Sequence, residues 1–131
     1  MRAAYVDTSC MLSIAFEEPG WRRTAEELRQ CEEIFSSNLL EAELFAAVRR
    51  ENSDVPRVES LRRLVWVWPD EPLTDYFRVV LSHGYLRGAD LWHLASALVL
   101  RDRIGEVSFM SLDKRQAEVA SRLGLRGLDW I

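Results

Sequence analysis

Short apolar runs and amphipathic stretches alternate along the 131-residue chain. The short runs contain β-branched and aromatic residues, which are typical of strands, and they cover residues 2–7, 34–36, 64–68 and 107–110. In the stretches between them, the spacing of apolar residues predicts helices over residues 10–16, 21–33, 38–52, 56–64, 72–85, 89–103 and 113–123. Residues 125–131 are expected to add a final short strand.

This alternation predicts the α/β fold class. Parallel neighbours need crossover connections, so we expect a three-layer α/β/α arrangement with a central, mainly parallel sheet. A chain of this length with 48% hydrophobic residues can build one core, and neither a repeat nor a linker interrupts the series of elements. Residues 1–131 are therefore interpreted as a single domain.

Two acidic residues directly follow predicted strands. Asp7 ends the first strand, and Asp113 follows the run over residues 107–110. In open parallel sheets the functional crevice lies at the carboxyl ends of the strands, so both carboxylates point toward one place. An Asp in such a position is also a common turn or cap residue, and this alternative stays open for each of them.

Two further acids fall on apolar helix faces. At about 100° per residue, Glu43 lies among the apolar residues of the helix over 38–52, whereas Glu41 lies on the solvated side. Asp90 aligns with Leu94 and sits in a first helical turn, where exposed N–H groups favour a negative charge. The alternatives are a buried salt bridge to an arginine for Glu43 and a helix cap for Asp90.

A divalent metal ion would reconcile the charges of these acids if they converge, because their mutual repulsion otherwise raises some of their pKa values. Oxygen ligands suit Mg²⁺, or Mn²⁺ as a substitute, rather than zinc or copper. Such a site activates water and stabilises in-line displacement, so it predicts phosphodiester hydrolysis. The candidate catalytic residues and metal ligands are Asp7, Glu43, Asp90 and Asp113, with supporting hydroxyls on Ser9 and Ser111.

The histidines and cysteines add little further chemistry. His83 and His93 are not paired as the general acid and base of a metal-free ribonuclease, and His93 is interpreted as a packing residue or as a support for a ligand. Cys10 and Cys31 lack both zinc-site spacing and the density of a secreted disulfide scaffold, which indicates a reducing, cytoplasmic location. The N-terminal residues match neither a signal peptide nor a membrane span.

The net charge of −4 argues at first sight against a nucleic-acid partner. Bound divalent ions would cancel much of the acidic contribution, however, and 16 of the 17 basic residues are arginines, which suit phosphate contacts. For the densest basic stretch, RNA binding and ordinary solvated helix faces are both open interpretations. This stretch comprises Arg49, Arg50, Arg57, Arg62 and Arg63.

Three segments carry a family resemblance: Tyr5-Val-Asp-Thr-Ser9, Arg87-Gly-Ala-Asp-Leu-Trp-His-Leu-Ala-Ser-Ala97 and Phe109-Met-Ser-Leu-Asp-Lys114. In order and spacing, and with a helical glutamate at mid-chain, they resemble the PIN-domain family, specifically the VapC-type toxins of bacterial toxin-antitoxin pairs. By this resemblance the family's acidic metal site corresponds to Asp7, Glu43, Asp90 and Asp113. Ser9 corresponds to the polar position that follows the first acid.

The resemblance implies a Mg²⁺- or Mn²⁺-dependent endoribonuclease that acts on an RNA substrate. It also implies a homodimer and a small VapB-like antitoxin, whose C-terminal tail enters the acidic groove, often through an arginine. Such a tail would compete with RNA and metal for the same carboxylates.

Two other function classes are weighed against this one. An aspartyl-phosphate enzyme could also carry an Asp after the first strand, but Ser9 stands where enzymes that resemble haloacid dehalogenases have a second Asp. The non-enzymatic alternative is a PIN-like module that binds RNA or a protein without cutting. Four intact acids favour an enzyme over this alternative.

Overall fold

Four parallel strands form the central sheet of the computed structural model, which describes residues 2–51 and 59–128. The strands are β1 (Ala3–Val6), β2 (Glu33–Ser37), β3 (Leu64–Val67) and β4 (Ser108–Met110). Their order is β3-β2-β1-β4, so β1 lies in the interior of the sheet, paired with β2 on one side and β4 on the other. The predicted α/β class with a parallel central sheet is confirmed.

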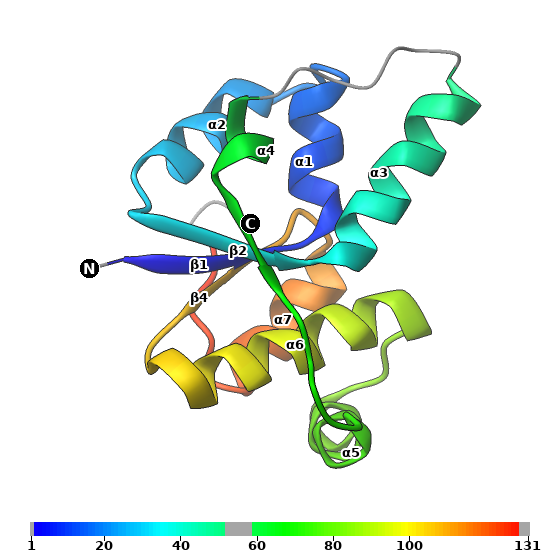
Figure 1. Ribbon diagram of the computed structural model, residues 1–131, viewed down its shortest axis with the longest axis vertical. Coiled ribbons are helices and arrows are strands. Elements are labelled where there is room, and N and C mark those ends of the chain that lie inside the picture. Colours follow the sequence, from blue (N-terminus) through cyan, green and yellow to red (C-terminus); the bar gives the residue numbers. More distant parts are fainter. Residues whose placement is uncertain (1, 52–58, 129–131) are drawn as a thin grey trace.

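Helices cover both faces of the sheet, as Figure 1 shows. One layer contains α1 (Thr8–Ala15), α2 (Trp21–Arg29), α3 (Asn38–Arg50) and α4 (Glu59–Arg63). The opposite layer contains α5 (Thr74–His83), α6 (Gly88–Ile104) and α7 (Lys114–Arg122). The three-layer α/β/α arrangement predicted from the sequence is therefore the observed one.

The alternation of side chains along β1 divides the core into two parts. Tyr5 packs with residues of α6 and α7 on one face, and Val6 packs with residues of α1 and α2 on the other. Successive side chains of a strand point to opposite faces, and helices on both faces bury all four residues of β1. The strand that leads into Asp7 is thus fixed from both sides.

Helix α6 is the longest of the described helices, with 17 residues, and its side chains from His93 to Leu100 are all buried. It packs on the sheet through Leu94 and Leu98 and on α5 through Ala95 and Val99, so both of these faces are apolar. Its first turn carries Asp90, which lines the cleft described below. No helix of the described chain is long and apolar enough to cross a membrane.

Several predicted boundaries differ from the structure. The first helix begins at Thr8 rather than at Cys10, because Asp7 itself occupies the cap position. The helix predicted over 21–33 ends at Arg29, since Glu33 already pairs in β2. In place of the final strand, the described residues show one parallel bridge between Ser108 and Arg126. Residues 52, 56–58 and 129–131 of the predicted elements lie outside the described ranges.

Candidate active site

The four acids predicted from the sequence line one open cleft of about 500 Å³ at the carboxyl ends of the strands. Each acid comes from a different element. Asp7 follows β1, Glu43 lies on α3, Asp90 lies in the first turn of α6, and Asp113 lies between β4 and α7. The structure therefore brings together side chains that are far apart in the sequence.

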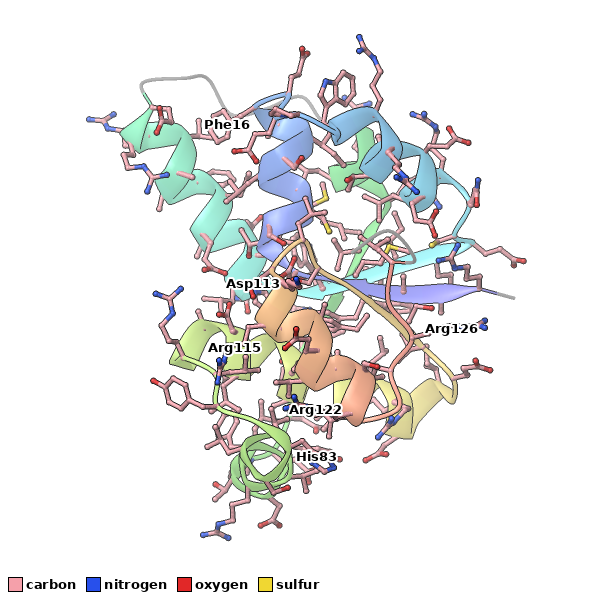
Figure 2. All side chains as sticks on the ribbon, turned by 180° about the vertical axis from the view of Figure 1, so that it is seen from behind. Phe16, His83, Asp113, Arg115, Arg122 and Arg126 are labelled. Carbon is pink, nitrogen blue, oxygen red and sulfur yellow. The ribbon has the colours of Figure 1, made fainter. Side chains whose placement is uncertain are left out.

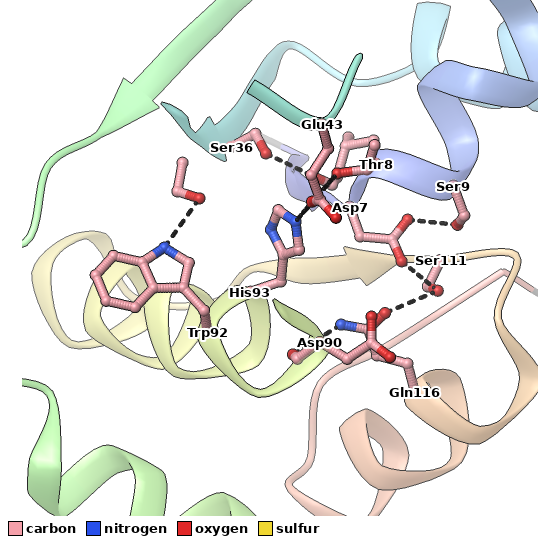
Figure 3. A network of polar contacts seen from close by, with 12 residues as sticks. Asp7, Thr8, Ser9, Ser36, Glu43, Asp90, Trp92, His93, Ser111 and Gln116 are labelled. Carbon is pink, nitrogen blue, oxygen red and sulfur yellow. Dashed lines mark hydrogen bonds and ion pairs between the residues drawn. The ribbon is translucent and has the colours of Figure 1, made fainter. Parts of the chain in front are cut away.

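Asp7 is held at the floor of this cleft by two serine hydroxyls. Ser9 Oγ donates to Asp7 Oδ1 at 2.6 Å, and Ser111 Oγ donates to Asp7 Oδ2 at 2.6 Å. Both serines are in turn fixed by backbone amides, because Leu112 N–H donates to Ser9 and Asp113 N–H donates to Ser111. Figure 3 shows the carboxylate between the two hydroxyls. The two serines singled out in the sequence thus orient the first acid.

Burial raises the pKa of the Asp7 carboxyl above its ordinary value, and the hydrogen bonds from Ser111 and Ser9 oppose this rise. The side chain is almost completely buried, and no lysine or arginine pairs with it within the described ranges. A desolvated carboxylate without a cationic partner is costly, and a bound cation is a direct way to stabilise it. The surroundings of Asp7 therefore favour a ligand of positive charge.

Glu43 is partnered by a histidine and a threonine. His93 Nε2 lies 3.0 Å from Glu43 Oε1, and Thr8 Oγ1 donates to the same oxygen at 2.6 Å. The hydrogen bond from His93 is the largest cause that lowers the pKa of Glu43, which is 34% exposed in its side chain. The expected alternative, a salt bridge from Glu43 to an arginine, is wrong because the histidine occupies that position.

The proton on His93 can be assigned from its other neighbour, Tyr5. Ser37 N–H donates to the Tyr5 hydroxyl at 3.1 Å, so the phenolic proton is free to donate to His93 Nδ1, 2.8 Å away. In the neutral imidazole the ring proton is then on Nε2, which faces Glu43. Burial raises the pKa of Tyr5 to about 12, so the phenol keeps its proton at neutral pH. This chain of hydrogen bonds fixes the direction in which Glu43 points.

Asp90 and Asp113 form the opposite wall of the cleft. Burial raises the pKa of Asp90, and the nearby carboxylate of Asp113 raises it further. Asp113 caps α7 by accepting the Gln116 N–H at 3.0 Å. It also lines the cleft, so the same residue is both a helix cap and a candidate ligand. The buried Gln116 side chain donates to the carbonyl of Asp90 at 2.9 Å and ties α7 to the start of α6. Repulsion was the expected cause of raised pKa values, but desolvation is the larger one.

The donors in the cleft are suited to a hard divalent cation, because carboxylate and hydroxyl oxygens are the ligands that Mg²⁺ and Mn²⁺ prefer. No three acidic, histidine or cysteine side chains of the described ranges lie close enough together to share one ion. The four acids therefore share a cleft without forming a ready-made cage. Mg²⁺ commonly binds through one or two carboxylates and keeps several waters, so a cage is not required.

The predicted arginine stretch does not act as one surface. Arg50 lines the acidic cleft, and Arg49 and Arg62 are exposed. Arg63 instead donates to the carbonyls of Leu28 and Cys31, which joins the end of α4 to the end of α2. For Arg63 the structure shows a local role, and Arg57 lies outside the described ranges.

Three contributing residues were missed in the sequence: Thr8, Tyr5 and Gln116. Thr8 lies between the predicted strand over residues 2–7 and the predicted helix over residues 10–16, and Tyr5 was predicted only as part of that strand. The sequence did contain one signal for the hydrogen-bond chain around Glu43. Asp90 and His93 are three positions apart, which puts both on one side of a helix and so places His93 near the acids. That spacing does not identify Tyr5 as the partner of His93, because the two are 88 positions apart.

The three-layer α/β/α fold places four carboxylates in one cleft at the carboxyl ends of its parallel strands, as the metal-site prediction requires. The chain belongs to the PIN domain family, which matches residues 4–122. Domains of this family are generally nucleases that depend on divalent metal ions. A comparison with curated protein sequences finds no significant match. The narrower VapC-type assignment stays a prediction.

Proposed function

We propose that this protein is a Mg²⁺-dependent endoribonuclease, with Mn²⁺ as a possible substitute, that hydrolyses phosphodiester bonds at Asp7, Glu43, Asp90 and Asp113. One observation carries the proposal: four carboxylates from four elements line a single cleft, and the described arginines and lysine form no ion pair with any of them. A phosphodiester is itself an anion, so an acidic cleft can accept it only together with cations.

The chain's own groups prepare the cleft for this reaction. Ser9 and Ser111 hold both oxygens of Asp7, which lines the cleft and keeps further lone pairs that can accept a ligand. His93 and Thr8 keep Glu43 ionised and fixed. A divalent ion bound to these carboxylates would supply positive charge to the scissile phosphate and favour ionisation of the attacking water.

Arg50 is the one arginine or lysine among the described residues that line the acidic cleft. It is exposed at the end of α3 and shares a long 3.4 Å contact with the exposed Glu51. Surface pairs of this kind contribute little stability, so the guanidinium can exchange Glu51 for a phosphate at small cost. We assign it the role of guiding the RNA backbone toward the acids.

RNA as substrate and the biological role rest on the resemblance of three segments to VapC-type toxins. On that basis the protein acts in the cytoplasm as the toxin of a toxin-antitoxin pair, forms a homodimer, and is inhibited by a small VapB-like antitoxin. The competing proposal is a PIN-like module that binds RNA or a protein without cutting. The buried carboxylate of Asp7, which has no cationic partner among the described residues, favours the enzyme, because a pure binding module has no use for so costly a group.

Purified protein freed of any antitoxin should cleave total RNA when Mg²⁺ is added. EDTA should stop the cleavage, and so should Asp7→Asn, which keeps the shape of the side chain but removes its charge. Circular dichroism of the variant checks that the fold is intact. Cleavage that persists with EDTA or in Asp7→Asn would disprove the metal-nuclease proposal, whereas tight RNA binding without cleavage would support the non-catalytic module.

A further inference from the structure

A second hollow, of about 390 Å³, adjoins the acidic cleft and shares Asp90 and Asp113 with it. Its other lining residues are Tyr85, Leu86, Arg87 and Arg115. The shared acids form the boundary between the two spaces, so a flexible chain that occupies one can continue into the other. The second hollow differs in character, because it combines an aromatic ring, an apolar floor and two cationic side chains.

Tyr85 is the most exposed large hydrophobic residue of the described chain, at 65%. Its backbone is nonetheless held firmly against α7. Arg115 Nε–H donates to the Tyr85 carbonyl at 2.9 Å, and Arg122 donates to the carbonyl of His83 at 2.9 Å. Between them, a Cβ added to Gly84 would lie only 2.8 Å from a methyl group of Val119, so the chain passes very close to the helix. An exposed ring on a fixed backbone is available for stacking.

The two arginines of the hollow keep donors free. Arg115 uses only its Nε–H in the hydrogen bonds found among the described residues, which leaves both terminal amino groups available. Arg87, at the cap position of α6, is exposed, and its guanidinium makes no hydrogen bond within residues 2–51 and 59–128. In Figure 2 Arg115 lies next to Asp113 at the start of α7. Free guanidinium donors beside a metal-binding cleft suit phosphate oxygens.

We infer that this hollow binds an unpaired nucleotide that flanks the scissile phosphate, with its base stacked on Tyr85 and its phosphate held by Arg87 and Arg115. The inference rests on the proposed nuclease function and adds a substrate subsite to it. Stacking on aromatic side chains together with arginine contacts is the usual way in which proteins bind single-stranded nucleic acid. Double-stranded RNA would hide its base faces, so the subsite selects single-stranded regions.

An extended peptide fits this hollow less well than a nucleotide. The hollow is lined by the loop between α5 and α6, the first turn of α6 and the start of α7, and it offers no sheet strand to which a peptide backbone could add. The arginines carry positive charge next to an aromatic ring, which matches a phosphate joined to a planar base. The nucleotide is therefore the occupant that the chemistry of the hollow favours.

Photocrosslinking tests the position of the base. The full-length protein is irradiated with a single-stranded, phosphorothioate-linked RNA that carries 5-iodouridine, with Ca²⁺ replacing Mg²⁺ to preserve the RNA. We expect mass spectrometry to find the crosslink on Tyr85. A crosslink on the matched exposed aromatic Trp68, which follows β3 and does not line this hollow, would show unspecific contact and overturn the inference.

Affinity measurements test the same subsite without relying on cleavage. Fluorescence anisotropy with the phosphorothioate RNA should give a Kd about tenfold higher for Tyr85→Ala than for the wild type, whereas Tyr85→Phe should bind as the wild type does. Arg87→Gln should reduce the slope of log K against log salt concentration by about 0.7, the value for one lost phosphate contact on a single strand. Trp68→Ala and Arg29→Gln are the controls and should leave both quantities unchanged.

The outcomes separate the subsite from the proposed function. If the wild type cleaves RNA and Tyr85→Ala binds RNA equally well, the subsite is wrong and the nuclease function stands. If the wild type neither binds nor cleaves RNA, both fall. If Tyr85→Ala instead weakens only the binding of a protein partner, the hollow is a protein-binding surface and the inference is overturned.

Discussion

The two ends of the parallel sheet carry hollows of very different chemistry. At the amino ends of β1 and β4 lies the larger one, about 610 Å³, which is lined by acids and by the arginines Arg2 and Arg126. There Glu27 pairs with Arg2 at 2.7 Å. At the carboxyl ends lies the smaller acidic cleft, whose four carboxylates have no such partner among the described residues. One end balances its charges and the other does not.

Under the proposed function, charge balance, and not volume, marks the functional end of the sheet. A hollow whose charged side chains are paired does not depend on a bound ligand for its stability. The acidic cleft keeps Asp7 and Asp90 at raised pKa values, which means that their charged forms are destabilised until something positive arrives. The following predictions test this contrast, from the largest expected effect to the smallest.

Neutralising an acid should strongly reduce activity at the carboxyl end of the sheet and leave it unchanged at the amino end. Glu43→Gln and Asp90→Asn should each lower kcat by more than about a hundredfold, because loss of a ligand should exceed the 10–100-fold cost of losing an outer partner. Glu27→Gln, at the amino end, should leave kcat unchanged. Initial rates on a labelled single-stranded RNA measure both. Inactivation by Glu27→Gln would break the comparison.

Removing the histidine that supports Glu43 should sharpen the contrast by showing that position matters as well as charge. His93→Ala should reduce activity by about 10–100-fold and raise the Mn²⁺ concentration needed for half-maximal rate. It should also lower the free energy of unfolding by about 1–3 kcal/mol, because the buried Tyr5 hydroxyl loses its acceptor.

A structural role of His93 alone would give a different result. In that case the loss of stability would remain, but the Mn²⁺ requirement of the folded variant would equal that of the wild type. Measuring the rate at several Mn²⁺ concentrations, at a temperature well below the unfolding transition of His93→Ala, separates the two cases.

A matched pair of serines offers a smaller test. Ser111→Ala removes a hydrogen bond to Asp7 at the carboxyl end, and we expect activity to fall about tenfold, in keeping with one lost bond to an ionised group. Ser108→Ala removes the same hydroxyl group from the lining of the amino-end hollow and should leave the rate unchanged. Equal rates for both variants would show that the orientation of Asp7 is unimportant.

The smallest predicted effect concerns stability without metal. The folded state raises the pKa of Asp7 above its ordinary value of 3.8, so it favours the protonated form. The associated stability is fully present below that value and is lost as pH rises through the folded pKa. At pH 7 in EDTA, Asp7→Asn should therefore raise the Tm by about 3–5 °C, and the difference should vanish near pH 3.

The ion pair at the other end provides the control for this measurement. Glu27→Gln breaks the contact with Arg2 and should lower the Tm slightly, since partly exposed pairs contribute less than about 1 kcal/mol. Thermal scans by circular dichroism across the pH range measure both variants. A lower Tm for Asp7→Asn at pH 7 in EDTA would contradict the view that the acidic cleft is destabilising without a cation.

The sequence predicted those parts of the fold and the site that depend on local patterns. Asp7 and Asp113 were found because they end strands, and Asp90 because it opens an apolar helix. These features need only the periods of strands and helices and the rule that parallel strands end at the same edge. The parallel sheet and its two helical layers followed from the same alternation of elements.

Features that depend on distant partners could not be predicted in this way. The contact between Tyr5 and His93, the hydrogen bond from Ser111 to Asp7 and the attachment of Arg63 to the end of α2 all join segments far apart in the sequence. The helix over residues 21–33 was predicted too long, because its charged residues are compatible with either a helix or the start of a strand. Pairing with β1 places Glu33 in β2 instead of in the helix. Tertiary packing overrides local preference at such positions.

The interior position of β1 ties the assembly of the cleft to the synthesis of β4. Ser111, which holds Asp7, follows it 104 positions later in the chain, and β4 beside β1 comes after the other described strands in sequence order. Bringing such distant segments together is slow and cannot start on a shorter chain. A nascent or truncated chain that ends before β4 therefore carries its first acid without Ser111 and Asp113, and so without the assembled cleft.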